Sequence, residues 1–214
     1  FLAALDPFRH LSSPEPPRLS RAAREQRYAK GEPHFREGQP SDAVWVVKTG
    51  RVHLMKFLAD GKVSTTCVMT SGELFCCLPA LDRKAYPVDA VVAEDTTVVQ
   101  IPADAFHEAM GRSPGFAQRT LCLFCDRLRQ VEHKSCMVYE SAEQRLVQVL
   151  LGLSKKFGRT VPLTRQELAD IAGTTHETAI RTLSQFGKAG WIRSSRGQTT
   201  ILHPDKLQTL LGKS

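Results

Sequence analysis

The sequence predicts an α+β protein in which a β-rich N-terminal domain is joined by one long helix to a small C-terminal domain of helices and a β-hairpin. Three patterns predict this order. Short β-branched segments separated by glycines run from Tyr28 to about Pro102, a helical periodicity takes over after Pro102, and two capped helices with a hairpin follow Thr164. The domains are therefore expected at residues 1–114, 115–140 and 141–214.

The positive charge of the chain is concentrated in its last third. The net charge is +7, and residues 141–214 hold 11 lysines and arginines against 5 acidic residues. A basic domain beside a nearly neutral one is typical of nucleic-acid-binding proteins. No apolar run is long enough to cross a bilayer and no secretory signal begins the chain, so we expect a cytoplasmic protein without a membrane partner. The chain starts at Phe1 rather than at methionine, which is consistent with a longer natural sequence.

The strands of the N-terminal domain are marked by turn signals. An Asp-Gly pair at residues 60–61 separates two β-branched segments and is a strong hairpin signal. A further β-branched stretch runs from Val88 to Ile101. Short strands at regular spacing predict a sandwich or a barrel-like roll. In the lead-in of residues 1–26 we expect helical segments broken by the proline cluster that begins at Pro14.

The long helix is predicted to carry a dimer interface. Its apolar residues recur at alternating spacings of four and three, which is the a/d stripe of a coiled coil. We expect a second copy of the chain to cover this stripe, and packing against the chain's own β-roll is the alternative. A second helix is predicted from about Ala142 to Phe157. The expected dimer interface consists of Leu121, Phe124, Leu128 and Val131, in a stripe that extends to Ala117, Ser135 and Val138.

The C-terminal domain has the spacing of a helix-turn-helix. Thr164 and Glu167 form a predicted capping box that starts a short helix, and Gly173 ends this helix. The next helix is predicted from about His176 to Lys188. Two short β-segments follow, around a basic tip that contains Arg196, and predict a wing. A plain helical hairpin is the alternative, which the wing and the local basicity disfavour.

Both halves of the chain resemble one known superfamily. The sequence LTRQELADIAGTTHETAIRTL, followed by GWI and ILHPDKL, resembles the C-terminal domain of the cAMP receptor protein/fumarate-nitrate regulator (Crp/Fnr) superfamily. KGEPHFREGQPSDAVWVVKTGRVHLM, followed by SGEL, resembles its cyclic-nucleotide-binding type of β-roll. The resemblance implies a homodimeric transcription regulator that binds a two-fold operator in double-stranded DNA and acts with RNA polymerase. The resemblance does not imply an enzyme. An enzyme with Cys76 as its nucleophile is the alternative, and it is disfavoured because nothing in the sequence supplies the ordered base that such a site needs.

The resemblance also identifies residues that read DNA. Glu177 and Arg181 match the base-reading pair of the family, in which a carboxylate accepts from cytosine N4 and a guanidinium donates to guanine O6 and N7. Two further family positions hold different residues here, His176 and Ile180, which puts the family's half-site in doubt for this chain. The predicted DNA-binding residues are Thr175, His176, Glu177, Ile180, Arg181 and Arg196.

The resemblance implies an effector site in the β-roll and disfavours a cyclic nucleotide there. Relatives that bind cyclic nucleotides hold the ribose with a Gly-Glu pair, which is present as Gly72 and Glu73. Their phosphate-binding pair aligns with Tyr86 and Pro87, and neither side chain can neutralise a phosphate. A shifted alignment would bring the two cations at residues 83–84 to this position.

Cysteines and histidines around the expected effector site leave three alternatives. The cysteines are small core residues, or a Cys or His side chain is the axial ligand of a haem as in gas-sensing relatives, or the thiols sense redox change or hold a metal or an iron–sulfur cluster. Haem or redox sensing is favoured over a cyclic nucleotide, and binding to DNA without any effector is a further alternative. The expected effector-site residues are Gly72, Glu73, Cys76, Cys77, Tyr86, Cys122 and Cys125, and the candidate haem ligands are His34, His53 and Cys76.

Overall fold

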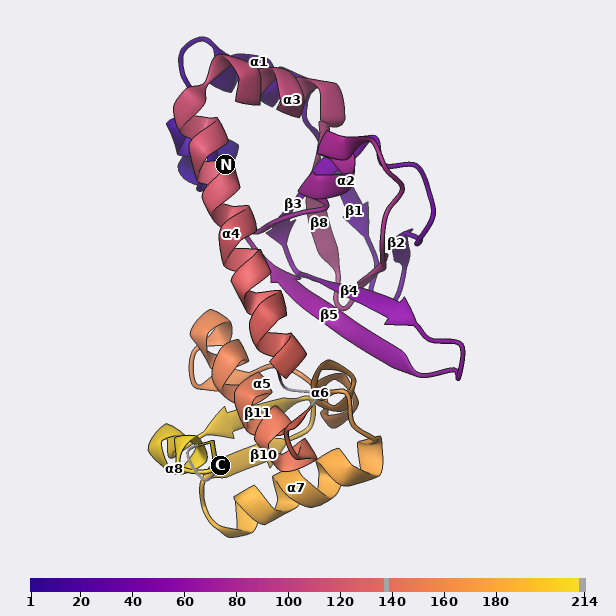
Figure 1. Ribbon diagram of the computed structural model, residues 1–214, viewed down its shortest axis with the longest axis vertical. Helices are drawn as coiled ribbons and strands as arrows, with labels where there is room; N and C mark the ends of the chain where they lie inside the picture. The colour runs from indigo at the N-terminus through magenta and orange to yellow at the C-terminus, as the bar shows by residue number, and fades with distance from the viewer. Residues whose placement is uncertain (137–138, 212–214) are drawn as a thin grey trace. The chain divides into compact units, whose positions relative to one another are not determined.

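The computed structural model of the protein describes residues 1–136 and 139–211, which form two compact units (Figure 1). The first unit consists of Phe1–Phe57 and Thr66–Glu132, and the second consists of Leu58–Thr65 and the chain from His133 onward. None of the helices in the described part of the chain is long and apolar enough to span a membrane.

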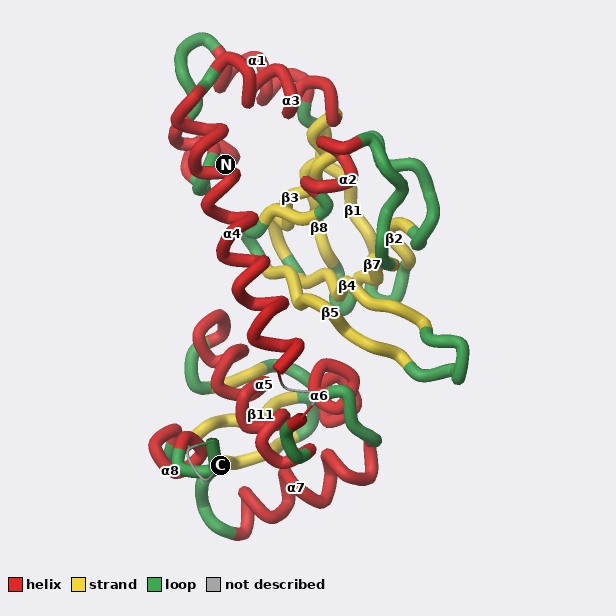
Figure 2. The backbone as a smooth tube through the Cα atoms, viewed as in Figure 1, coloured by secondary structure: helices red, strands yellow, loops and turns green. Residues whose placement is uncertain are grey.

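The first unit contains a β-roll built from two four-stranded sheets (Figure 2). One sheet has the strand order β1-β8-β3-β6, and the other has the order β2-β7-β4-β5. The β-roll confirms the fold class that the glycine-separated strand pattern predicts. The strands are β1 (Arg24–Tyr28), β2 (Pro33–Phe35), β3 (Ala43–Thr49), β4 (Arg51–Phe57), β5 (Val63–Thr70), β6 (Leu74–Phe75), β7 (Asp89–Val92) and β8 (Thr96–Pro102).

Helices cover the outer face of the sheet that contains β3. All five residues of the apolar run 43–47 in this strand are buried, which is the pattern of a strand covered on both faces. Trp45 and Val47 belong to a core between the two sheets, which we name the inner core. Val44 and Val46 belong to a second core beneath the helices, which we name the outer core. These helices are α1 (Glu15–Ala22), α3 (Ala103–Arg112) and α4 (Pro114–Cys136).

The proline cluster near the N-terminus begins a helix rather than breaking one, which corrects the sequence prediction for this segment. Helix α1 starts at Glu15 with proline in its first turn, where backbone N–H groups have no intrahelical partner. Two short 3-10 helices, Leu2–Ala4 and Phe8–His10, precede α1. Phe8 is 1% exposed in the outer core, and its ring centroid lies 5.5 Å from that of Phe116.

Helix α4 packs on the outer core with one face and exposes another. Phe116 and Thr120 are fully buried, and Phe124 packs partly buried against the outer core. The rest of the predicted dimer stripe is open to solvent within this chain. Leu121, Leu128 and Val131 are 56%, 59% and 58% exposed. The side chains of Ser135 and Val138, which continue the stripe in the sequence, lie outside the described residues.

The second unit has the winged helix-turn-helix architecture that the sequence predicts. Its three-stranded sheet has the order β10-β11-β9. The segment between the first two helices of this unit contains the short strand β9, which pairs with β11. The elements are α5 (Ala142–Phe157), β9 (Thr160–Val161), α6 (Arg165–Ala172), α7 (His176–Lys188), β10 (Ile192–Ser195), β11 (Gln198–Ile201) and α8 (Pro204–Gln208).

Candidate functional site

Local caps determine where the two helices of the helix-turn-helix begin and end. The hydroxyl of Thr164 accepts from the N–H of Glu167 at 3.2 Å, and the Glu167 carboxylate accepts from the N–H of Thr164 at 2.7 Å. This is the predicted capping box. Gly173 ends α6 in the left-handed conformation, at φ 59°, which glycine adopts without steric cost. Thr175 is the N-cap of α7, and its hydroxyl accepts from the N–H of Thr178.

Helix α7 exposes a polar face opposite an apolar one. Leu183 and Phe186 are almost completely buried against the rest of the unit. Glu177 and Arg181 are exposed and lie one helical turn apart. The backbone N–H of Glu177 and the hydroxyl of Thr175 hold the pKa of Glu177 below its ordinary value. The carboxylate is therefore ionised at neutral pH, as an acceptor of hydrogen bonds from a base edge must be.

The predicted wing is a tight hairpin. Strands β10 and β11 pair from Ile192 with Ile201 to Ser195 with Gln198, which leaves a two-residue turn. The turn consists of Arg196 and Gly197, and Gly197 has φ 75°. A positive φ at this position suits a two-residue hairpin loop. Arg196 is consequently exposed at the tip of the wing.

A cleft of about 480 Å³ opens between the wing and the starts of α6 and α7. His176 and Arg196 line it, together with Arg165 and Gln166, which the sequence analysis did not select. Two arginines and a histidine around a polar cleft at the start of two helices suit the negative charge of a DNA phosphate. The signal for Arg165 and Gln166 was present in the sequence, because both follow the capping threonine at the start of a helix. Ile180, by contrast, is partly buried on α7.

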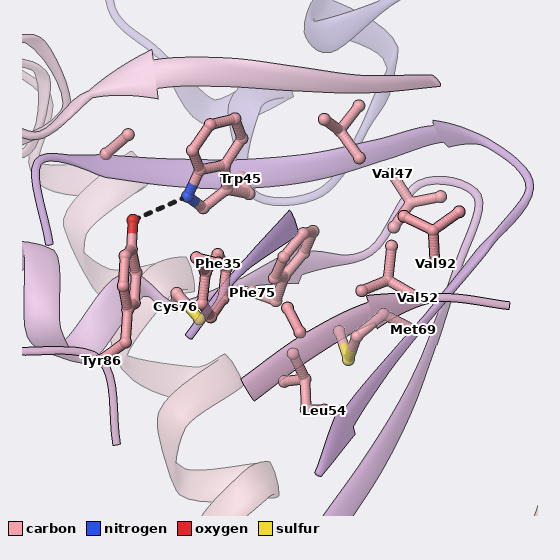
Figure 3. Close-up of a cluster of buried hydrophobic side chains, with 13 residues drawn as sticks. Phe35, Trp45, Val47, Val52, Leu54, Met69, Phe75, Cys76, Tyr86 and Val92 are labelled. Atoms are coloured by element: carbon pink, nitrogen blue, oxygen red, sulfur yellow. Dashed lines mark hydrogen bonds between the residues drawn. The ribbon is translucent and has the colours of Figure 1, made fainter. Parts of the chain in front are cut away.

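Tyr86, which aligns with the phosphate-binding position of cyclic-nucleotide binders, is part of the inner core. Its ring stacks on that of Phe35 with the centroids 3.8 Å apart, and its hydroxyl accepts from Nε1 of Trp45 at 2.9 Å (Figure 3). Tyr86 is 4% exposed. Burial raises the pKa of Tyr86, so the side chain is neutral. Tyr86 therefore supplies aromatic packing to the inner core and no positive charge.

Gly72 and Glu73 form the turn between β5 and β6. The Glu73 carboxylate accepts from both the N–H and the hydroxyl of Thr70, each at 2.8 Å. The N–H of Gly72 donates to the carbonyl of Val47 at 2.8 Å. The carboxylate that the resemblance assigns to a ribose thus folds back onto its own turn.

The imidazole of His34 is enclosed by aromatic rings. Its centroid lies 4.1 Å from that of Trp45 and 4.7 Å from that of Tyr28, and the rings of Phe35 and Phe75 lie at 5.1 and 5.9 Å. Both ring nitrogens are buried without a hydrogen-bond partner. Burial lowers the pKa of His34 to about 4. At neutral pH the imidazole of His34 is therefore neutral and packs among aromatic rings.

The adjacent cysteines Cys76 and Cys77 lie in different cores. Cys76 packs in the inner core and Cys77 packs in the outer core. They separate at a sharp bend, because Cys76 has φ 56° between the end of β6 and helix α2 (Cys77–Asp82), which the sequence analysis did not predict. Burial raises the pKa of both thiols, to about 11 for Cys77. Both are protonated at neutral pH, and a protonated thiol is a poor nucleophile and metal ligand.

Cys122 and Cys125 are exposed on α4, unlike the two core cysteines. His53, the remaining candidate ligand, is 4% exposed in β4. Within the described residues, no group of three or more His, Cys, Asp or Glu side chains could hold a metal ion. The side chain of Cys136 lies outside the described residues. The described thiols and imidazoles therefore form separate environments rather than one ligand set.

Two family models match the two parts of the chain. A cyclic nucleotide-binding domain matches residues 25–113, and a Crp-like helix-turn-helix domain matches residues 144–210. The cyclic AMP receptor protein of Thermus thermophilus is 28% identical over 176 residues, which cover 81% of this chain and 82% of the relative. The transcriptional activator protein anr of Pseudomonas aeruginosa is 26% identical over 192 residues, which cover 86% of this chain and 78% of the relative.

A solved structure agrees with these matches. FixK2 from Bradyrhizobium japonicum has a TM-score of 0.80 and 25% sequence identity, over 88% of this chain and 96% of FixK2. The matched domains occur here as a β-roll followed by a capped helix-turn-helix with a wing. The chain therefore belongs to the Crp/Fnr family of DNA-binding transcription regulators, which are not enzymes.

Proposed function

We propose that the protein is a homodimeric regulator that reads a two-fold DNA operator with Glu177 and Arg181 of α7. The polar face of α7 carries this proposal, because both side chains are exposed one turn apart while the opposite face is buried. An ionised carboxylate and a guanidinium at this spacing can accept from cytosine N4 and donate to guanine O6 and N7. Arg165 and Arg196 in the neighbouring cleft would contact phosphates, which position the protein without reading sequence.

Replacement of Arg181 tests the reading role. Duplexes selected from a random pool by the wild-type protein supply the operator, and the dissociation constants for operator and random duplex are measured at one fixed salt concentration. We expect Arg181→Ala to weaken operator binding about 10- to 100-fold, because one bidentate base contact is lost. Binding to random DNA should change far less, because it depends on phosphate contacts.

Lys155→Ala is the matched control for charge. Lys155 is exposed in the last turn of α5, and its replacement also removes one positive charge from the unit. We expect this variant to weaken binding to the operator and binding to random DNA by the same small factor. Equal operator affinity of Arg181→Ala and Lys155→Ala would contradict the assignment.

The dimer proposal rests on the exposed apolar stripe of α4. Leu121, Leu128 and Val131 are each more than half exposed in the single chain, and a second copy would cover them at coiled-coil spacing. A dimer of two such domains predicts that the selected operator is two-fold symmetric, with half-sites about one DNA turn apart. A cytoplasmic location and RNA polymerase as a partner are inferred from membership of the family.

We infer that the effector of this regulator is not a cyclic nucleotide. The stacked and hydrogen-bonded Tyr86 supports this inference, because it offers no cation at the phosphate position. Of the two other effector classes, the packing favours a thiol oxidant over a haem-bound gas. His34, His53 and Cys76 are enclosed, whereas Cys122 and Cys125 are exposed on the helix that carries the dimer stripe.

Three measurements test the effector proposal. Isothermal titration with cyclic AMP and cyclic GMP should detect no binding at millimolar ligand, and micromolar binding of either would refute the first inference. A visible spectrum of protein purified anaerobically without added cofactor should lack a Soret band, and hydrogen peroxide should change operator affinity. A Soret band would assign the haem class instead. If neither hydrogen peroxide nor a cyclic nucleotide changes the operator affinity, the protein binds DNA without an effector.

A further inference from the structure

Arg145 of α5 joins three backbone carbonyls from two separate segments of the second unit. Its Nε donates to the carbonyl of Ala172 at 2.8 Å, and its two terminal nitrogens donate to Gly173 at 3.1 Å and to Glu140 at 2.7 Å. Ala172 and Gly173 are the end of α6 and the turn of the helix-turn-helix. Glu140 lies between α4 and α5. A guanidinium is suited to this arrangement, because its five N–H groups form a rigid planar fork.

The end of α6 needs such donors. The last carbonyls of a helix have no intrahelical N–H partner, and they carry the negative end of the helix dipole. The N–H groups of Gly173 and Thr174 both donate to the carbonyl of Ala169, so neither of them donates to the carbonyls that follow it, among them those of Ala172 and Gly173. Arg145 donates to the carbonyls of Ala172 and Gly173 and brings a positive charge to this helix end.

The turn that Arg145 holds leads directly into α7. Thr174 and Thr175 alone separate Gly173 from the first residue of α7. A shift of this turn would therefore move the start of α7, where Glu177 lies. Base reading tolerates little displacement, because bidentate contacts require hydrogen-bond distance and alignment at both atoms.

We propose that Arg145 is a positioning residue for DNA reading, which fixes the orientation of α7 by holding the turn at Ala172 and Gly173. This inference rests on the proposed function of α7. The hydrogen bond from Arg145 to the carbonyl of Glu140 also connects this turn to the segment that follows α4. A displacement of that segment would therefore move the turn. Glu140 has a second, independent tie, because its carboxylate accepts from Nε2 of Gln148 at 2.7 Å.

The test compares binding to the selected operator and to a random duplex for the full chain, well below its unfolding temperature. Arg145→Met removes all three hydrogen bonds, and Arg145→Lys keeps the charge but lacks the planar fork. Glu140→Ala is the matched control, because it removes the tie to Gln148 and leaves the carbonyl that Arg145 contacts. The measured quantity is the ratio of the random-DNA to the operator dissociation constant. A residue that only stabilises the fold would lower the unfolding temperature and leave this ratio unchanged.

We expect Arg145→Met to lower the ratio about tenfold or more, Arg145→Lys to lower it by a smaller factor, and Glu140→Ala to keep the wild-type ratio. A wild-type ratio for Arg145→Met overturns the inference, and so does a loss in Glu140→Ala as large as that in Arg145→Met. If Arg145→Met does not fold, an unchanged ratio in Arg145→Lys overturns it equally. A wild-type protein that does not discriminate between the two duplexes overturns the proposed function as well, whereas the outcomes above leave that function intact.

Discussion

Replacement of His34 by leucine is expected to make the β-roll less sensitive to acid. The imidazole is partly buried in β2 among aromatic rings, and neither of its nitrogens has a hydrogen-bond partner. Burial lowers the pKa of His34 from 6.5 to about 4, because the charged form loses its hydration. The folded roll therefore holds this side chain neutral at a pH where the unfolded chain already binds a proton.

The sign of the effect follows from proton linkage. Because the pKa of His34 is lower in the folded state, its stability contribution is complete above about pH 6.5 and is lost as the pH falls towards about 4. A shift of about 2.5 pKa units corresponds to about 3 kcal/mol in total. Between about pH 7.5 and about pH 5 the roll should lose about 2 kcal/mol of unfolding free energy through this residue. His34→Leu should lack this loss.

The assay is urea unfolding at the two pH values, followed by the fluorescence of Trp45 in the inner core. A Trp191→Phe background removes the other tryptophan, so that the signal reports on the roll alone. His107→Gln, at an exposed position on α3, is the matched control and should show the full loss. If His34→Leu loses as much unfolding free energy as the control between the two pH values, His34 is not the residue that the folded state keeps neutral.

Three further predictions concern the caps, the dimer stripe and the thiols. Thr164→Ala should destabilise the helix-turn-helix by about 1 kcal/mol because the capping box is lost, which amide exchange in α6 would detect; unchanged exchange would contradict it. Leu128→Asp should yield a monomer with weak operator binding in sedimentation and binding assays, whereas Gln130→Asp on the same helix should remain dimeric. Maleimide should label Cys122 in the native protein and label Cys77 only after unfolding; fast native labelling of Cys77 would refute its burial.

The helix-turn-helix that carries the proposed DNA-reading residues could be predicted because its determinants are local. Thr164, Glu167 and Gly173 specify the start and the end of α6 through bonds within a few residues. Helical periodicity places Glu177 and Arg181 one turn apart on the same face, whereas their proposed role in base reading comes from the resemblance to the family. Arg145 escaped prediction for the opposite reason. Its three acceptors lie up to 28 residues away, and no periodicity indicates which carbonyls a guanidinium will meet.

The parts of the fold that the sequence analysis missed have weak local signals. Strand β1 consists of Arg-Glu-Gln-Arg-Tyr, which lacks β-branched residues, and pairing with β8 alone makes it a strand. The prolines at the start of α1 are predicted to break a helix. Proline is tolerated in the first turn of a helix and breaks its interior, so its effect depends on where the helix begins. Helix α2 begins after a left-handed Cys76, a conformation that a non-glycine residue rarely adopts.

The effector site divides into a part that sequence determines and a part that packing determines. The place of Tyr86 at the family's phosphate-binding position follows from the sequence once the strand that ends at Ile101 is aligned with the family. The packing of Tyr86 does not follow from the sequence, because only the fold brings Phe35, 51 residues away, onto the Tyr86 ring and Trp45, 41 residues away, to its hydroxyl. The same holds for Cys76 and Cys77, which are adjacent in sequence and buried in opposite cores. Two cysteines that are adjacent in the sequence are thus not a pair in space, and for this reason the proposed thiol chemistry is placed at the cysteines that α4 exposes.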